Sequence, residues 1–288
     1  MRSGYAAADG AKLYFERRGG GPPLLMIAGG GGDCGAFTAI ANMLSSSYTV
    51  IAYDRRGNSR SALLRPPVEI EIAEQSADAV AVLRANGFEK ALVFGTSGGA
   101  TIALDIAARH PEAAEAVIAH EPPVPRILPD AEEILDEYDE IGRVLDTEGW
   151  REAFKMFLAF NRLTPPNSPA ALKAVLEPES VLPPGPLLEL MKRQAGNWEY
   201  MMRFEVPSFV DYVPDLRRIS ENRTKTVMGA GAETRGQYLH RASEAIAERL
   251  GAKFVEFPGG HSGAFEVPRE FSVELRALLE EPGRPAPL

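Results

Sequence analysis

The stretch that decides the fold is residues 91–110, which read ALVFGTSGGATIALDIAARH. Four apolar residues, 91–94, lead into Gly95-Thr96-Ser97-Gly98-Gly99, and residues 101–109 continue with a helical pattern. Gly-x-Ser-x-Gly between a strand and a helix is typical of a sharp turn that exposes a serine hydroxyl at the carboxyl end of a sheet. The flanking glycines fit, because so tight a turn requires small residues. Ser97 is therefore the candidate nucleophile, and the alternative is a glycine-rich helix entry with an incidental serine.

The rest of the chain alternates between short apolar runs and helical patterns. Runs that are apolar at every position predict strands buried on both faces, as in a parallel sheet covered by helices. We therefore predict an α/β fold with a doubly wound, mostly parallel, eight-stranded sheet. The expected strands are 5–8, 12–17, 23–28, 49–53, 91–94, 116–120, 224–228 and 253–257, and the expected helices are 37–44, 73–86, 101–109, 237–250 and 268–279.

Residues 122–214 differ from the rest of the chain in composition and in their pattern of apolar residues. They contain 13 of the 23 prolines and no convincing strand, but they include short helical patterns. This predicts a helical cap inserted into a core domain made of residues 1–121 and 215–280. The acidic run 130–140 is expected to be a solvated helix face, and the proline-rich tail 281–288 is expected to be disordered.

Composition excludes several classes of function. A net charge of −9 argues against a nucleic-acid partner, and no apolar run approaches the roughly 18 residues of a membrane span. A single cysteine, Cys34, rules out an internal disulfide and fits a reducing compartment, and with four histidines it builds no zinc site. We expect a cytoplasmic protein that acts on a small molecule without metal or cofactor, and the oligomeric state stays open.

A serine nucleophile needs a base, and four histidines are available. His261 stands in the glycine-rich loop 258–263 after the final expected strand, where an α/β sheet builds its site. His110 is expected to cap a helix end or face solvent, His120 to be a core residue, and His240 to be exposed in mid-helix. His261 is therefore the candidate base.

Two carboxylates compete to orient that imidazole. Glu121 ends the expected strand 116–120 and is followed by two prolines, whereas Glu233 follows the expected strand 224–228 across a glycine-rich turn. Topology alone does not separate them, because both lie at carboxyl ends of strands. The more rigid setting of Glu121 favours an orienting role.

The oxyanion of an acyl-transfer intermediate needs two backbone N–H donors. Gly98, the residue after the nucleophile, supplies one, and the glycine loop 29–32 supplies the other, which we assign to Gly30. The loop lacks the motifs of a nucleotide cradle. Cys34 beside it is expected to be a small buried residue rather than a rival nucleophile.

With these motifs the chain resembles the α/β-hydrolase fold family over essentially the whole sheet domain. The order Ser97, acid, His261 is the order of that family, and residues 54–61, DRRGNSRS, look like its Asp-x-x-Gly-x-x-x-Ser loop. Two departures are the Ala28-Gly29 pair in place of His-Gly and the absence of the usual Asp near Glu233. Some haloalkane dehalogenases and the fungal zearalenone-type lactonases carry a Glu at the position of Glu121. The lactonases look closest, through Asp33-Cys34 and His120-Glu121.

The sequence thus predicts a serine hydrolase acting through an acyl-enzyme on an ester or lactone of a bulky, apolar substrate. Aromatic residues of the cap, with Trp198 named as a substrate contact, suggest an apolar pocket roof, and two cap arginines, Arg193 and Arg203, are expected at the surface. A thioesterase, a C–C hydrolase, a peptidase and a perhydrolase use the same triad and stay open. A non-catalytic ligand receptor on this fold is the alternative from another class.

Overall fold

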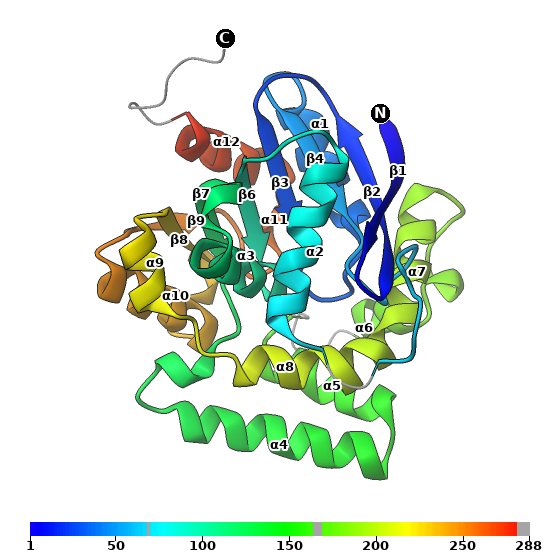
Figure 1. The fold of residues 1–288 in the computed structure, drawn as a ribbon. Helices are drawn as coiled ribbons and strands as arrows, with labels where there is room; N and C mark the ends of the chain where they lie inside the picture. Colours follow the sequence, from blue (N-terminus) through cyan, green and yellow to red (C-terminus); the bar gives the residue numbers. More distant parts are fainter. Residues whose placement is uncertain (68–69, 164–168, 281–288) are drawn as a thin grey trace.

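The central element of the fold is a mixed β-sheet. The computed structural model describes residues 1–67, 70–163 and 169–280 (Figure 1). The main path of the sheet has the order β1-β2-β4-β3-β6-β7-β8-β9. Pairing is antiparallel between β1 and β2 and between β2 and β4, and parallel from β4 onward. These strands are β1 (Arg2–Ala8), β2 (Ala11–Arg18), β3 (Pro23–Ile27), β4 (Thr49–Tyr53), β6 (Ala91–Thr96), β7 (Ala114–His120), β8 (Lys225–Gly231) and β9 (Lys253–Phe257).

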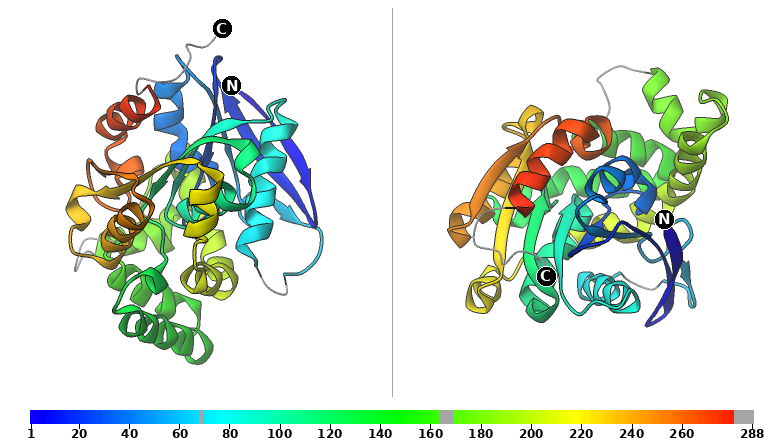
Figure 2. Two further views of the ribbon diagram at one scale, coloured as in Figure 1. Left: turned by 60° about the vertical axis from the view of Figure 1, so that its left-hand side comes forward. Right: turned by 90° about the horizontal axis from the view of Figure 1, so that it is seen from above.

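The sheet has an apolar core on each face, which explains why a central strand such as β3 is apolar at every position. In β3, Leu24 and Met26 join the core on one face, and Leu25 and Ile27 join the core on the other. Helices α1 (Thr38–Leu44) and α12 (Pro268–Leu279) cover the first face. Helices α2 (Ile72–Ala85), α3 (Gly98–Arg109) and α10 (Tyr238–Leu250) cover the second (Figure 2).

Between β7 and β8 the described residues form helices joined by loops, with no strand. Its helices gather below the sheet in Figure 1, next to the carboxyl ends of the strands. In α4 the buried residues are apolar or aromatic, among them Ile134, Tyr138 and Ile141. The elements are η3 (Pro125–Ile127), α4 (Ala131–Thr147), α5 (Trp150–Phe160), α6 (Pro169–Leu176), η4 (Pro178–Ser180), α7 (Pro186–Tyr200), the π-helical turn η5 (Met201–Glu205) and α8 (Val206–Asp211).

The eight predicted strands and five predicted helices are present, with shifted ends and some additions. Strand β6 continues through Thr96 and β8 through Gly231, so the glycines after each apolar run still pair. A two-residue strand, β5 (Ala62–Leu63), pairs with β2, and a helix, α9 (Leu216–Asn222), precedes β8; neither has a predicted counterpart. The predicted tail lies outside the described residues. No helix in the described part of the chain is long and apolar enough to cross a membrane.

Candidate active site

Ser97 occupies a strained turn between β6 and α3. Its backbone has φ 54° and ψ −128°, a conformation that costs a non-glycine residue about 1–3 kcal/mol. The turn packs so tightly that a Cβ at Gly95 would lie 2.1 Å from the Gly99 carbonyl oxygen. A Cβ at Gly99 would meet the Ile27 carbonyl oxygen at the same distance. The Ser97 N–H donates to the carbonyl oxygen of His120 at 2.8 Å, which fixes the turn to β7.

His261 and Glu121 form a hydrogen-bonded pair beside this turn. His261 lies in the loop between β9 and the short helix α11 (Gly263–Glu266), and its Nδ1 is 2.6 Å from Glu121 Oε2. Ser97 and His261 line the same two cavities. The three side chains therefore converge from the carboxyl ends of β6, β7 and β9.

Glu121 is fully buried and heavily hydrogen-bonded. Its Oε1 accepts from the Gly231 N–H at 2.9 Å and from the Thr234 hydroxyl. Burial raises the pKa of this carboxyl, but the hydrogen bond and charge of His261 outweigh it, with help from Thr234, and lower the pKa to about 2. Glu121 is therefore a carboxylate at neutral pH. Its φ of 52° is a second positive value at the site.

In the part of the chain that the structure describes, no hydrogen bond joins Glu233, His110 or His240 to His261. Glu233 is exposed on η6 (Ala232–Thr234), whereas Glu121 bonds to His261. The expectation that His240 is exposed is wrong: it is buried on α10, with Nε2 3.2 Å from Glu256 Oε1. His110 lies at the end of α3, half-buried.

His120 is a core histidine, as expected. It is fully buried, and its Nδ1 lies 3.1 Å from the Thr96 hydroxyl. Burial lowers its pKa to about 4, so the ring is neutral at physiological pH. Its ring packs edge-to-face on Phe257 and Phe271, as expected for a residue of the hydrophobic core.

The glycine loop after β3 lies directly against Ser97. A Cβ at Gly29 would be 2.6 Å from the Cβ of Ser97, so only glycine permits this approach. Gly30 lines both cavities with Ser97, and Gly98 lines one of them. The backbone N–H groups predicted as oxyanion donors thus belong to residues that line a cavity together with Ser97.

Two mainly apolar cavities meet at Ser97 and His261. An inner cavity of about 40 Å³ lies under α4, α5 and α8, and an outer cavity of about 280 Å³ opens between α5, α7 and α11. Trp198 lines the outer cavity, stacks on Phe154 at 4.7 Å and donates its Nε1–H to the Val175 carbonyl. Phe157 lines both cavities.

A small polar cluster borders the inner cavity. The hydroxyls of Tyr138 and Tyr238 are 2.6 Å apart, and both lie within 3.0 Å of Asn161 Oδ1. Two of these residues, Tyr138 and Asn161, line the cavity itself. The inner cavity therefore has an apolar wall with one polar end.

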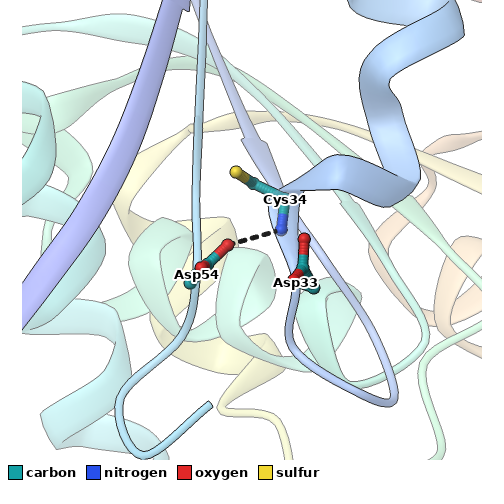
Figure 3. Close-up of side chains that lie close together, drawn as sticks. All are labelled: Asp33, Cys34 and Asp54. Atoms are coloured by element: carbon teal, nitrogen blue, oxygen red, sulfur yellow. Dashed lines mark hydrogen bonds between the residues drawn. The ribbon is translucent and has the colours of Figure 1, made fainter. Parts of the chain in front are cut away.

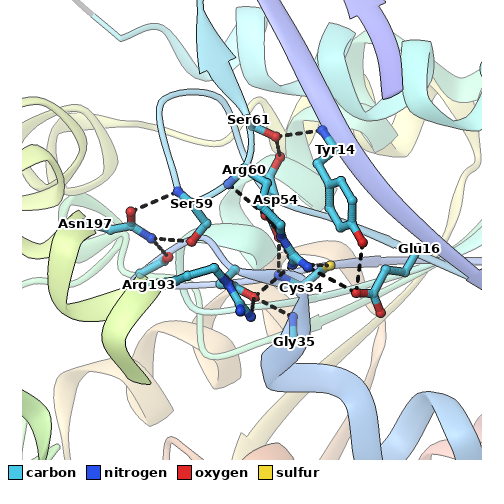
Figure 4. Close-up of polar contacts among 12 residues, drawn as sticks. Tyr14, Glu16, Cys34, Gly35, Asp54, Ser59, Arg60, Ser61, Arg193 and Asn197 are labelled. Carbon is cyan, nitrogen blue, oxygen red and sulfur yellow. Dashed lines mark hydrogen bonds and ion pairs between the residues drawn. The ribbon is translucent and has the colours of Figure 1, made fainter. Parts of the chain in front are cut away.

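Among the described residues, one group has the composition of a metal site: Asp33, Cys34 and Asp54, all buried (Figure 3). Its carboxylate oxygens already accept from N–H donors. Asp54 binds the Cys34 N–H and the Arg60 guanidinium, and Asp33 binds the guanidinium groups of Arg60 and Arg193 (Figure 4). Burial and the neighbouring Asp54 raise the pKa of the Cys34 thiol well above its usual value, so it is a neutral buried residue. This group is an ion-pair network.

Arg193, expected at the surface, has 30% of its side chain exposed and belongs to this network. Its Nε lies 2.6 Å from the buried Asp33 Oδ2, so it connects α7 to the end of the glycine loop. Arg203 is exposed as expected and pairs with Glu199. One turn after Arg193, Asn197 donates to the Gly31 carbonyl at 2.6 Å and accepts from the Ser59 N–H at 2.9 Å (Figure 4).

Sequence reasoning missed a buried ion pair that joins the loop after β4 to η5, the π-helical turn that follows α7. Arg55 and Glu205 lie 150 residues apart and make a two-pronged ion pair, with N–O distances of 2.5 and 2.9 Å. Glu205 lines the inner cavity. The signal in the sequence was the position of Arg55 in the motif of residues 54–61, two residues after the end of β4.

The strand order, the strained serine turn and the cavity at the carboxyl edge of the sheet are those of an α/β-hydrolase. A model of the alpha/beta hydrolase fold matches residues 22–163. Over 285 residues the chain is 32% identical to the "Uncharacterized hydrolase YraK" of Bacillus subtilis (strain 168), covering 98% of this chain and 97% of that protein. The chain therefore belongs to the alpha/beta hydrolase fold family.

Solved structures of esterases and a lactonase share the fold. Est816, described as an N-acyl homoserine lactone degrading enzyme, matches with a TM-score of 0.71 and 22% identity over 95% of this chain and 99% of that chain. The carboxylesterase CesB (YbfK) of Bacillus subtilis matches with a TM-score of 0.70 and 18% identity over 97% and 91%. At such identities the likeness shows the fold alone.

Proposed function

We propose that this protein is a serine hydrolase that cleaves carboxylic esters or lactones through an acyl-enzyme. The observation that carries the proposal is the strained Ser97 turn, which shares its cavities with the hydrogen-bonded pair of His261 and Glu121. A nucleophile, a base and an orienting acid at one point are what acyl transfer requires. The hydrolase and esterase names among the relatives agree with this chemistry.

The ionised Glu121 sets the tautomer of His261. A carboxylate only accepts hydrogen bonds, so the 2.6 Å contact requires His261 Nδ1 to carry the proton. The Nε2 lone pair is then available to accept the proton of the Ser97 hydroxyl. Glu121 also stabilises the imidazolium that forms when this proton arrives.

Two half-reactions follow. The Ser97 oxygen adds to the substrate carbonyl carbon while its proton passes to His261 Nε2, and the carbonyl π electrons move to oxygen. The tetrahedral intermediate collapses, the bond to the leaving alcohol breaks, and His261 returns the proton to the alcohol oxygen. Water then attacks the acyl-enzyme with His261 as base, releasing the acid and restoring Ser97. The N–H groups of Gly30 and Gly98 stabilise the oxyanion in both halves.

The two cavities support a substrate of unequal halves. The inner cavity of about 40 Å³ accommodates a group of a few heavy atoms, whereas the outer cavity of about 280 Å³ accommodates a bulky, apolar one. Arg55 and Arg193, near the cavities, are already paired with carboxylates, which disfavours an anionic substrate. Each 100 Å² of apolar surface buried is worth up to about 2.5 kcal/mol, or tens of fold in kcat/KM.

Hydrolysis of a p-nitrophenyl ester series tests the proposal. We expect turnover that is lost in Ser97→Ala, together with fluorophosphonate labelling of the parent protein that the alanine variant lacks. Esters, lactones, thioesters, peptides and C–C substrates compared by mass spectrometry then identify the bond. A folded protein that neither turns over any of them nor takes the probe is a ligand receptor on this fold, and the proposal is wrong.

A further inference from the structure

Arg55 is a buried arginine whose hydrogen-bonding capacity is completely used. Its Nε donates to the Ala28 carbonyl at 3.0 Å. Its Nη1 donates to Gln75 Oε1 at 2.8 Å and to Glu205 Oε1 at 2.5 Å, and its Nη2 donates to the Gly29 carbonyl at 2.9 Å and to Glu205 Oε2 at 2.9 Å. All five N–H groups of the guanidinium have partners. It therefore acts on neighbouring protein groups and has no donor left for a ligand.

Two of these partners belong to the loop that holds the proposed oxyanion donor. The Gly29 carbonyl and the Gly30 N–H are parts of one peptide unit. Because that unit is planar and trans, its C=O and N–H point in opposite directions. The Gly29 oxygen accepts from Arg55 and, at 3.1 Å, from the Gly32 N–H, so both of its lone pairs are used. Fixing this oxygen fixes the direction of the Gly30 N–H.

The same bond also strengthens that N–H as a donor. Hydrogen bonds to a carbonyl oxygen polarise the amide, and linked hydrogen bonds reinforce one another in a low-dielectric interior. Arg55 carries a full positive charge, which makes its bond to Gly29 charge-assisted. The Gly30 N–H therefore gains orientation and donor strength from a single guanidinium.

Glu205 keeps this guanidinium in place. It is fully buried on the π-helical turn η5 and binds Arg55 with both oxygens, while its Oε1 also accepts from Asn58 Nδ2 at 2.9 Å. An arginine buried without a counter-charge would be strongly unfavourable. Met201, at the start of the same turn, packs on the loop, since its sulfur would lie 3.2 Å from a Cβ at Gly30.

We propose that Arg55 and Glu205 are positioning residues of the oxyanion hole. Arg55 orients and polarises the Gly29–Gly30 peptide, and Glu205 holds Arg55 from the helical segment that roofs the cavity. This inference rests on the proposed serine-hydrolase function, because it concerns the stabilisation of the oxyanion formed from Ser97. A purely structural ion pair would affect folding stability without a selective effect on the transition state.

Arg55→Lys is the principal variant. Lysine keeps the charge, but its single nitrogen lacks the fork that reaches two carbonyls and a carboxylate together. Losing a whole oxyanion donor costs about 10²–10³-fold in kcat, so a misdirected donor should cost about 10–100-fold, with KM changed by less than about threefold. Glu205→Gln, which keeps the shape of the side chain, should lower kcat by a smaller factor.

Asp78→Asn is the matched control. Asp78 pairs with Arg56, the neighbour of Arg55, in an ion pair that is also buried, with an Nε–Oδ2 distance of 2.5 Å. Among the described residues the partners of the Arg56 side chain are Asp78, Glu74 and the Asp9 carbonyl, none of which belongs to the glycine loop. We expect Asp78→Asn to lower the melting temperature while kcat stays within about twofold.

A trifluoromethyl ketone provides the second readout. The Ser97 oxygen adds to its carbonyl carbon, the serine proton passes to His261, and the resulting oxyanion occupies the hole. The inhibition constant should rise in Arg55→Lys by the factor that kcat falls, and stay unchanged in Asp78→Asn.

The outcomes separate this inference from the proposed function. If the parent protein shows no Ser97-dependent turnover and no ketone adduct, the proposed function fails. If the parent protein is active and folded Arg55→Lys keeps kcat and ketone affinity within about twofold, the positioning role is wrong. If Asp78→Asn loses as much kcat and ketone affinity as Arg55→Lys, the positioning role is also wrong. If Arg55→Lys does not fold, kcat and ketone affinity are measured in Glu205→Gln, and the same criteria apply.

Discussion

Replacing Glu121 by glutamine removes the charge of the carboxylate and preserves its shape. The orientation of the new amide follows from the contacts of Oε1, which accepts from the Gly231 N–H at 2.9 Å and from the Thr234 hydroxyl. A backbone N–H only donates, so the amide oxygen must occupy this position. The amide NH₂ then faces His261 Nδ1, which must become an acceptor. The ring proton moves to Nε2, and His261 loses the lone pair that takes the proton of Ser97.

Two contributions set the size of the effect. The interaction with His261 is the main cause that lowers the pKa of Glu121 from 4.5 to about 2, and such a difference corresponds to about 3 kcal/mol. Loss of a similar stabilisation of the imidazolium would alone slow the reaction about 10²-fold. The wrong tautomer adds to this, and wrong-tautomer variants of Ser–His–Asp enzymes lose about 10⁴-fold in kcat. We expect kcat to fall by about 10³–10⁴-fold.

The assay is steady-state hydrolysis of a p-nitrophenyl ester between pH 6 and 9, with thermal unfolding to show that the variant folds. Glu233→Gln is the matched control: it makes the same chemical change on an exposed carboxylate and should alter kcat less than about twofold. A folded Glu121→Gln variant that kept more than about a tenth of the parent rate would refute the orienting role. If Glu233→Gln were the slow variant, the triad acid would be misassigned.

Three other predictions concern stability and specificity. Folding lowers the pKa of Glu121 from 4.5 to about 2, so its contribution of about 3 kcal/mol to the free energy of unfolding is complete above pH 4.5 and is lost as pH falls towards 2. Urea unfolding across this pH range should therefore show a smaller pH dependence of stability in Glu121→Gln than in the parent protein. Ser97→Gly should be more stable than Ser97→Ala by about 1 kcal/mol in denaturant unfolding, because glycine relieves the positive φ; equal stabilities would argue against strain at the turn. Trp198→Ala should reduce kcat/KM about tenfold or more for long-chain esters and little for acetates, because it removes a wall of the outer cavity; a uniform loss along the series would place Trp198 outside the substrate contacts.

The sheet was predictable because its signal is local. A run that is apolar at every position, such as β3, needs cover on both faces, and glycines lie near the ends of several strands, as Gly29 and Gly30 do after β3. The candidate site follows from the same logic, since Ser97, Glu121 and His261 each stand at the carboxyl end of a predicted strand. Which acid bonds to His261 depends on side-chain direction, and the sequence alone does not contain that information.

The features that sequence reasoning missed depend on contacts between distant segments. The pairs Arg55–Glu205 and Asp33–Arg193 join residues 150 and 160 positions apart, and a charged residue carries no local sign of a buried partner. His240 was misassigned because its helical neighbours include charged residues, although the buried face of α10 is wide enough to include it. The strand β5 has only two residues, which is too short for any periodic pattern.

The π-helical turn η5 has a consequence for helix phase. Arg193, Asn197 and Glu205 all contact the glycine loop or the residues that brace it, from one continuous helical run over α7 and η5. An α-helix rotates about 100° per residue, so the eight residues from Asn197 to Glu205 would overshoot the shared face by about 80°. A π turn takes more residues per revolution and absorbs part of this excess. The irregular turn therefore brings Glu205 closer to the side of the helix that Arg193 and Asn197 occupy, and one helical run contacts the glycine loop and the residues that brace it at three levels.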